Sequence, residues 1–191
     1  CPGGDCSGGL GCWNYGFGNY AMLSEIIRRA TGGKLDLLTD PAATLPSFFG
    51  ARTEILAGIY PSISDVDVSV QPSERLSALL SDRFGFPVKS RTPATPGLWR
   101  SDYDSLVLTP IPNPAPPIKT PNVLADLAWR TWFPHGGVLI SRPALPGTPP
   151  FAVCLKGGHN NESHNHNDVG SFMVVSGKTM LICDPGKTVY T

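Results

Sequence analysis

SFMVVSGKTMLICD, residues 171–184, is the stretch that decides how the second half of this chain folds. Two apolar runs, Ser171–Ser176 and Thr179–Asp184, flank Gly177-Lys178, a pair typical of a two-residue hairpin turn with glycine first. The sequence therefore predicts an antiparallel hairpin. A regular register pairs Ser176 with Thr179 and places Asp184 opposite Ser171.

Two more short strands are expected upstream, at Gly136–Arg142 and Phe151–Lys156, because both runs are apolar and bounded by glycine or proline. The first half of the chain is different. Helices are expected at Asn19–Gly33 and Pro72–Gly85, since apolar residues recur at helical spacing and glycines follow them. In the first helix the buried face should carry Tyr20, Leu23 and Ile27, with Met22, Ile26 and Ala30 beside them.

Asp65–Val70 alternates polar and apolar residues, which predicts a half-buried strand. Between Phe86 and Pro121 the chain is rich in proline, which excludes a helix or a central strand there. The pattern changes from helical to strand-like near residue 121. We therefore expect an α+β protein whose helical part precedes its sheet.

Composition limits the classes of function. The 191 residues are 41% hydrophobic and 16% charged, and their net charge is zero, which argues against broad binding to nucleic acids or anionic membranes. No apolar run approaches the roughly 20 residues of a membrane span, so none is expected. The chain begins at Cys1 and ends just after a strand. We expect it to be an internal piece of a longer protein, truncated at both ends.

Five cysteines cannot all pair within one chain. Cys1, Cys6 and Cys12 lie in a glycine-rich stretch at a spacing looser than that of zinc motifs, so incidental thiols or one disulfide are favoured over a zinc site. Cys154 and Cys183 lie in apolar runs, and we expect both to be buried.

The candidate site is GGHNNESHNHNDVGSF, residues 157–172, which holds three of the four histidines. In an extended segment His164 and His166 would point to one face, as metal ligands or as acid–base groups. Asp184 would be a third member. It reaches His166 only if the chain bends between Asp168 and Gly170, which glycine permits. The alternative is a polar loop whose side chains only cap backbone groups.

A resemblance to a known family rests on these residues. The segments FAVCLKGGHNNESHNHNDVGSFMVV and MLICDPGKTVY resemble the β-sheet domain of the heparinase II/III-like polysaccharide lyases, a superfamily that includes alginate and oligoalginate lyases. RTWFPHGGVLISRP is similar to the strand that opens this domain, and CWNYGFGNYAMLSEIIRRATGG to a late helix of the family's α/α toroid.

The resemblance implies three regions. Residues 1–33 would be the last part of the toroid, 34–120 a connecting region, and 121–191 the start of an antiparallel β-sandwich. It also implies an enzyme that cleaves uronic-acid polysaccharides, such as alginate or a glycosaminoglycan, by β-elimination, and that is secreted or periplasmic. This chain alone should be inactive, because the toroid's own catalytic groups would precede Cys1.

Roles for individual residues follow from the same resemblance. His164 matches the catalytic histidine of the sheet domain, and Tyr15 is the choice for the catalytic tyrosine, with Tyr20 in reserve. His166 and Asp184 match two ligands of a structural zinc ion whose third ligand would lie beyond this chain.

The sequence also departs from the family pattern, and this keeps other functions open. Cys12 stands where a tyrosine is common, and His135 where an aspartate is common. Two rivals therefore remain. One is a non-catalytic domain that binds carbohydrate or acts as a scaffold. The other is a metal-dependent hydrolase in which His164, His166 and Asp184 activate water.

Overall fold

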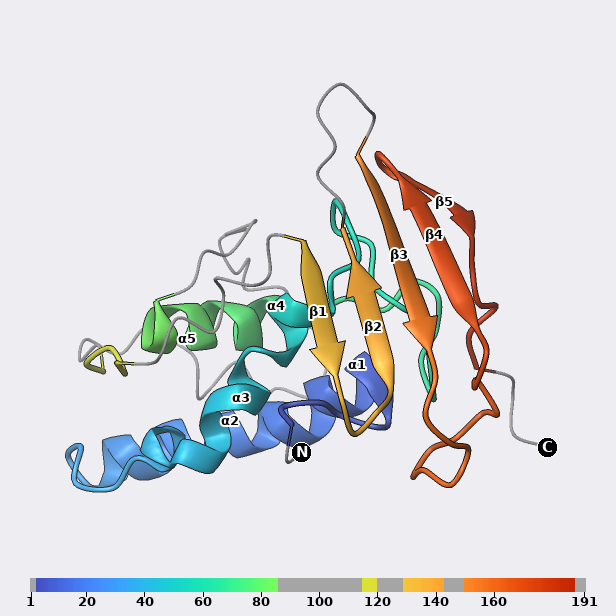
Figure 1. The fold of residues 1–191 in the computed structure, drawn as a ribbon. Helices are drawn as coiled ribbons and strands as arrows, with labels where there is room; N and C mark the ends of the chain where they lie inside the picture. The colour runs from blue at the N-terminus through green and yellow to red at the C-terminus, as the bar shows by residue number, and fades with distance from the viewer. Residues whose placement is uncertain (1–2, 86–114, 120–128, 143–149, 188–191) are drawn as a thin grey trace, which may run out of the picture.

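The fold is α+β, as the sequence predicts: a helical part packs against one face of a five-stranded antiparallel sheet (Figure 1). The structure, a computed structural model, describes residues 3–85, 115–119, 129–142 and 150–187. The predicted boundary near residue 121 and most of the proline-rich passage lie outside these residues. No described helix has the length and apolarity that crossing a membrane requires.

The helical part contains two long helical stretches, one near the start of the chain and one formed by α5. The first is continuous from Gly9 to Ala30 and comprises α1 (Gly9–Cys12), the π-helical turn η1 (Trp13–Phe17) and α2 (Gly18–Ala30). After it come the 3₁₀ turn η2 (Leu37–Thr39), α3 (Pro41–Ser47), α4 (Phe49–Thr53) and α5 (Glu74–Phe84). The α5 helix matches its predicted position, with Ser73 as N-cap and Gly85 left-handed just after its end.

The α2 helix forms as predicted, but the prediction of its buried face is wrong for Leu23 and Ile26, whereas Tyr20 packs against the core. Leu23 and Ile26 are 49% and 44% exposed, whereas Ser24, Glu25 and Arg28 are buried. Ion pairs explain the reversal, because a buried charge needs a partner. Glu25 accepts hydrogen bonds from Arg28 and Arg29, and Arg83 of α5 pairs with Asp36 beside it; Tyr20 donates to the Leu37 carbonyl. Burial raises the pKa of Glu25, but its arginine partners outweigh this and lower it below the ordinary value.

The strand predicted at Asp65–Val70 is absent from the structure. These residues form an irregular loop that passes between the helices and the sheet. Val66 is buried there, its amide donates to the Ser64 carbonyl, and its own carbonyl accepts a hydrogen bond from the Lys187 amide. The alternation in the sequence does not match the burial of these residues, since Val66 is buried but Val68 is 45% exposed.

The sheet follows chain order, β1-β2-β3-β4-β5, with every neighbouring pair antiparallel. Four strands match predicted ones with small differences at their ends: β2 (Val138–Ser141), β3 (Phe151–Lys156), β4 (Phe172–Ser176) and β5 (Thr179–Ile182). The first strand of the sheet, β1, spans Arg130–Phe133.

The hairpin register is confirmed only near its turn. Ser176 pairs with Thr179 and Val175 with Met180, but a β-bulge then pairs Val174 with Ile182. The bulge moves the end of β5 out of the regular register, so the expected pairing of Asp184 with Ser171 is not formed. Cys183, predicted to be buried, is exposed, whereas Cys154 in β3 is fully buried and burial raises its pKa to about 12.

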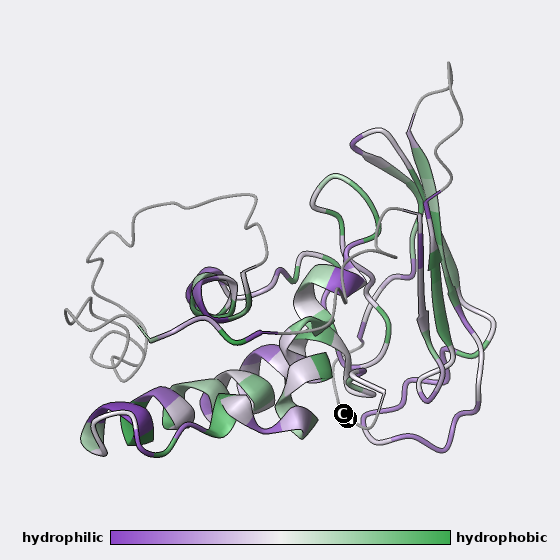
Figure 2. Cartoon of the chain, turned by 60° about the vertical axis from the view of Figure 1, so that its left-hand side comes forward, coloured by the Kyte–Doolittle hydropathy of each residue, from purple (hydrophilic) through white to green (hydrophobic). Residues whose placement is uncertain are grey.

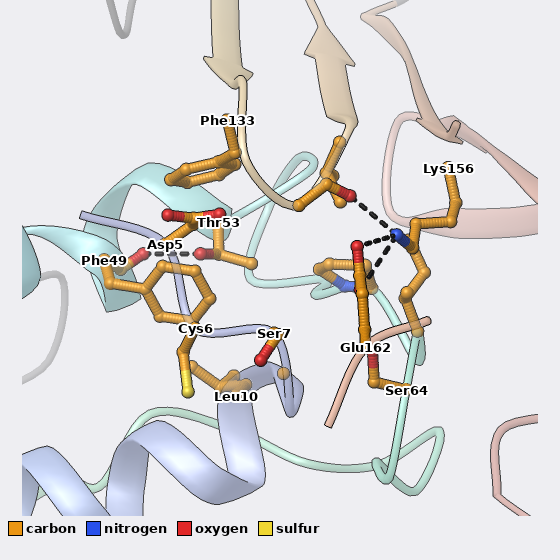
Figure 3. A pocket seen from close by; sticks show the side chains of 15 residues that line it. Asp5, Cys6, Ser7, Leu10, Phe49, Thr53, Ser64, Phe133, Lys156 and Glu162 are labelled. Carbon is orange, nitrogen blue, oxygen red and sulfur yellow. Dashed lines mark hydrogen bonds and ion pairs between the residues drawn. The ribbon is translucent and has the colours of Figure 1, made fainter. Parts of the chain in front are cut away.

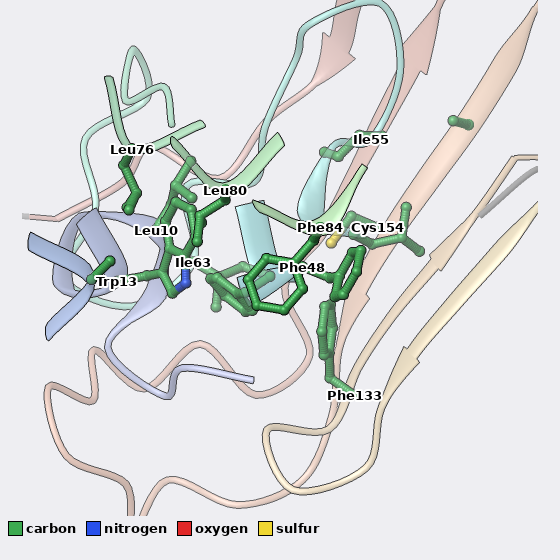
Figure 4. Close-up of a cluster of buried hydrophobic side chains, with 14 of the residues drawn as sticks. Leu10, Trp13, Phe48, Ile55, Ile63, Leu76, Leu80, Phe84, Phe133 and Cys154 are labelled. Atoms are coloured by element: carbon green, nitrogen blue, oxygen red, sulfur yellow. The ribbon is translucent and has the colours of Figure 1, made fainter. Parts of the chain in front are cut away.

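The core lies between the helices and the inner face of the sheet (Figure 4). Thr131, Ile140, Cys154 and Met173 form one inward-facing row across β1 to β4. Phe133 of the same face packs against Phe49 of α4, with ring centroids 5.3 Å apart. The two layers are therefore joined mainly by apolar burial.

Arg142, at the end of β2, fastens the sheet to α4. Its guanidinium donates to the carbonyl of Arg52 in the last turn of that helix, to the carbonyls of Glu54 and Ile55 just after it, and to the Thr131 hydroxyl. Helix ends leave carbonyls without partners, and a cation there satisfies several at once. Burial lowers the pKa of Arg142 from its ordinary value.

The outer face of the sheet is apolar as well. Trp132, Leu139, Leu155 and Phe172 form a row across β1 to β4, and Trp132, Leu155 and Phe172 are 50%, 42% and 48% exposed. Figure 2 shows the sheet nearly edge-on, with the helices on one side and apolar colouring along the strands. Among the described residues, nothing covers this face.

Candidate functional site

The histidine-rich loop between β3 and β4, residues 157–171, begins at a buried ion pair. The Lys156 side chain, at the end of β3, donates to the Gly136 and Gly157 carbonyls at 2.7 and 3.2 Å and lies 3.1 Å from both carboxylate oxygens of Glu162. The two side chains are 3% and 8% exposed. This pair holds the first half of the loop against the β1–β2 turn.

Gly137 of that turn contacts the loop through its backbone. It has φ +60°, its carbonyl accepts from the Gly157 amide at 2.7 Å, and a Cβ there would lie 2.7 Å from the Gly157 carbonyl carbon. We expect Gly137→Ala to lower the free energy of unfolding by about 1–3 kcal/mol, since it combines backbone strain with a steric clash. Urea unfolding measures this. Gly177→Ala, also at positive φ but with open space around it, should cost less, and equal losses would contradict the clash.

The second half of the loop is anchored by Asp168. Its carboxylate accepts from the Ser64 amide at 2.6 Å, and its carbonyl accepts from the Ser171 amide in a tight turn. Gly170 in that turn has φ +97°. The bend predicted between Asp168 and Gly170 is therefore confirmed.

His164 and His166 converge on one carboxylate, that of Asp65. His164 Nδ1 lies 3.3 Å from Asp65 Oδ2, and His166 Nε2 lies 3.8 Å from Asp65 Oδ1. Lys187 Nζ lies 3.6 Å from the same Oδ1, which is buried and has no hydrogen-bond partner. The loop is not extended here, since His164 has φ +60°. The imidazoles nevertheless face a common centre.

Exposure separates the roles of these two histidines. The His164 side chain is 49% exposed, so a ligand can reach its ring while Asp65 holds Nδ1. A carboxylate at one nitrogen fixes the tautomer and leaves the other nitrogen for proton transfer. The His166 side chain is only 14% exposed, which suits a structural role. His159, the third histidine of the loop, is exposed.

Sequence reasoning missed Asp65. The alternating pattern assigned residues 65–70 to a strand, and a carboxylate 99 positions before His164 carries no local signal of contact. The site is also flanked by Cys12. Its sulfur and His164 Cδ2 both lie within 3.4 Å of the point that a Cβ on Gly8 would occupy. Burial and the Asp65 carboxylate raise the pKa of this thiol.

The other predicted site residues, Tyr15 with its reserve Tyr20 and Asp184, form their hydrogen bonds away from the Asp65 carboxylate. Tyr15, on η1, is 78% exposed, and its carbonyl accepts from Asn19; Tyr20, the reserve, is partly buried with its hydroxyl bonded to a backbone carbonyl. The Asp184 carboxylate accepts from the Gly186 amide at 2.9 Å. Among the described residues no three His, Cys, Asp or Glu side chains are arranged to hold a metal, so the pairing of His166 with Asp184 in a zinc site stays a prediction.

The arrangement places a half-exposed imidazole between a partly buried carboxylate and solvent, next to a lysine and a thiol. It suits proton transfer to or from a bound ligand. No protein-family model matches the sequence, and no curated protein matches it at a significant level.

Proposed function

We propose that this chain is part of a polysaccharide lyase that cleaves uronic-acid polysaccharides, such as alginate or a glycosaminoglycan, by β-elimination. The observation that carries the proposal is the contact of His164 with Asp65, which joins the loop of the sheet to the helical part. In the elimination, a base removes the proton from the ring carbon next to the carboxylate. The bond to the glycosidic oxygen then breaks, and an acid protonates that oxygen.

Each step has a candidate residue. His164 is the proposed base, since Asp65 orients its ring and half of its side chain is open to a ligand. Lys187 would help to neutralise the substrate carboxylate, which makes the neighbouring proton more acidic. Tyr15 is the proposed proton donor, and its exposure leaves it free to meet a substrate.

The finer fold belongs to the same proposal. The helical stretch of α1, η1 and α2 would close an α/α toroid, whose preceding helices would cover the exposed Leu23 and Ile26. The apolar outer row of the sheet would be covered by the second sheet of a β-sandwich. Zinc would be held by His166 and Asp184 with one further ligand, nitrogen and oxygen donors that this ion accepts. Secretion or export to the periplasm fits an extracellular substrate.

The test uses a protein that carries this chain together with a complete toroid, incubated with alginate, heparin and hyaluronan. Elimination creates a carbon–carbon double bond conjugated with the carboxylate, so ultraviolet absorbance should rise together with new reducing ends. New reducing ends without absorbance would indicate the hydrolase instead. Neither signal would favour the non-catalytic domain. This chain alone should give no product.

A further inference from the structure

A pocket of about 40 Å³ lies where the start of α1, helix α4 and the sheet meet (Figure 3). Leu10, Phe49, Ile63 and Phe133 give it a mainly apolar wall, and the side chains of Asp5 and Lys156 also line it. A cavity needs a volume of roughly 10–15 Å³, on the same measure, to hold one water molecule. The pocket therefore accommodates a group of about three heavy atoms by that measure.

Asp5 is the unusual member of this wall. The residue is only 7% exposed, and its Oδ1 is buried without a hydrogen-bond partner. The nearest imidazole nitrogen, His135 Nδ1, lies 4.0 Å away on a side chain that is 58% exposed. That distance is too long for a hydrogen bond.

The other cations near the pocket are already engaged. Lys156 is neutralised by Glu162. Arg52 donates to the Trp132 carbonyl and lies over the Phe133 ring at 4.7 Å; its charge also interacts with Asp5, but it does not fill the hydrogen-bonding capacity of Asp5 Oδ1. A buried carboxylate oxygen left without a hydrogen-bond donor is destabilising. Asp5 is thus an anionic group that faces an accessible space.

We propose that this pocket binds a primary alkylammonium group, whose nitrogen donates to Asp5 Oδ1 while its carbon atoms pack against Phe49 and Phe133. Aromatic faces attract such cations. The mainly apolar wall does not suit divalent ions such as Ca²⁺, which take six or more oxygen ligands. A free amine or an amino sugar can supply the group. The proposal is independent of the elimination proposed above.

The test titrates the 191-residue chain with ethylammonium chloride at constant ionic strength and follows amide chemical shifts by NMR. We expect saturable shifts at the amides of Asp5 and Gly136, and a melting temperature that rises with ethylammonium but not with sodium. Glucosamine should cause the same shifts if an amino sugar fits, whereas N-acetylglucosamine, which is uncharged, should not. Binding of ethylammonium but not glucosamine would assign the pocket to small free amines.

Asp5→Asn keeps the shape of the side chain and removes its charge. We expect ethylammonium affinity to fall about tenfold or more, as for loss of a hydrogen bond to a charged group. The Asp67→Asn variant changes the net charge equally at an exposed site and should bind as the parent does. The absence of saturable shifts in the parent chain, or equal affinity in the Asp5→Asn variant, would overturn the proposal. If Asp5→Asn does not fold, the melting temperature of the parent chain with ethylammonium, compared with sodium, still tests the proposal. An equal effect of the two cations would overturn it.

Discussion

Lys156→Met should lower the free energy of unfolding by about 3–5 kcal/mol, because it leaves the Glu162 carboxylate buried without a counter-charge. The Gly136 and Gly157 carbonyls would also lose their common donor. Methionine fills a similar volume, so a cavity contributes little to the loss. Urea unfolding, followed by circular dichroism, gives the measurement.

Two further variants isolate the ion pair. Lys178→Met removes the same charge from an exposed turn and should change the stability by no more than about 0.5 kcal/mol. Lys156→Met combined with Glu162→Leu removes both charges and should recover much of the loss, as buried pairs replaced by apolar groups often do. A double variant no more stable than the single one would show that hydrogen bonds to the turn, and not the ion pair, hold the loop.

In a protein with a complete toroid and measurable elimination, His164→Ala should lower turnover by about 100-fold or more, the usual contribution of a positioned acid–base group. The fold should survive, since half of this side chain faces solvent. Initial rates of ultraviolet absorbance measure the effect, and the melting temperature checks folding.

His159→Ala is the matched control for this experiment, because it removes an exposed histidine from the same loop. It should stay within about twofold of the parent rate, as expected for a residue with no part in proton transfer. The turnover of Asp65→Asn should lie between those of His164→Ala and His159→Ala. This variant leaves the imidazole in place but weakens its orientation. If His164→Ala itself retained nearly full turnover, the loop would be a polar surface feature.

The sheet could be predicted from sequence because its information is local. Short apolar runs and the turn residues that bound them place β2 to β5 and the Gly177-Lys178 hairpin within a few residues. The bulge between Val174 and Val175 could not be predicted, since neither valine differs from an ordinary strand residue. It shifts the pairing of Ile182 by one residue from the regular register.

The errors in the helical part have another physical origin. Hydrophobic periodicity assumes that a helix buries its apolar face, but α2 buries the charges of Glu25 and Arg28 because partners are available. Helices α3 and α4 are short, and Pro46 lies inside the first of them, so neither produces a periodic pattern. In the candidate site, the spacing of His164 and His166 suggests that they share a centre, but the Asp65 carboxylate that they share depends on a tertiary contact.

His164 lies in the left-handed region of backbone conformation, with φ +60°. Side chains with a Cβ are strained there, whereas glycine adopts it freely, and asparagine, as at position 167 of the same loop, tolerates it. The fold itself would thus be better served by a glycine at position 164. An imidazole at position 164 therefore costs backbone stability, a cost that the proposed acid–base role would account for.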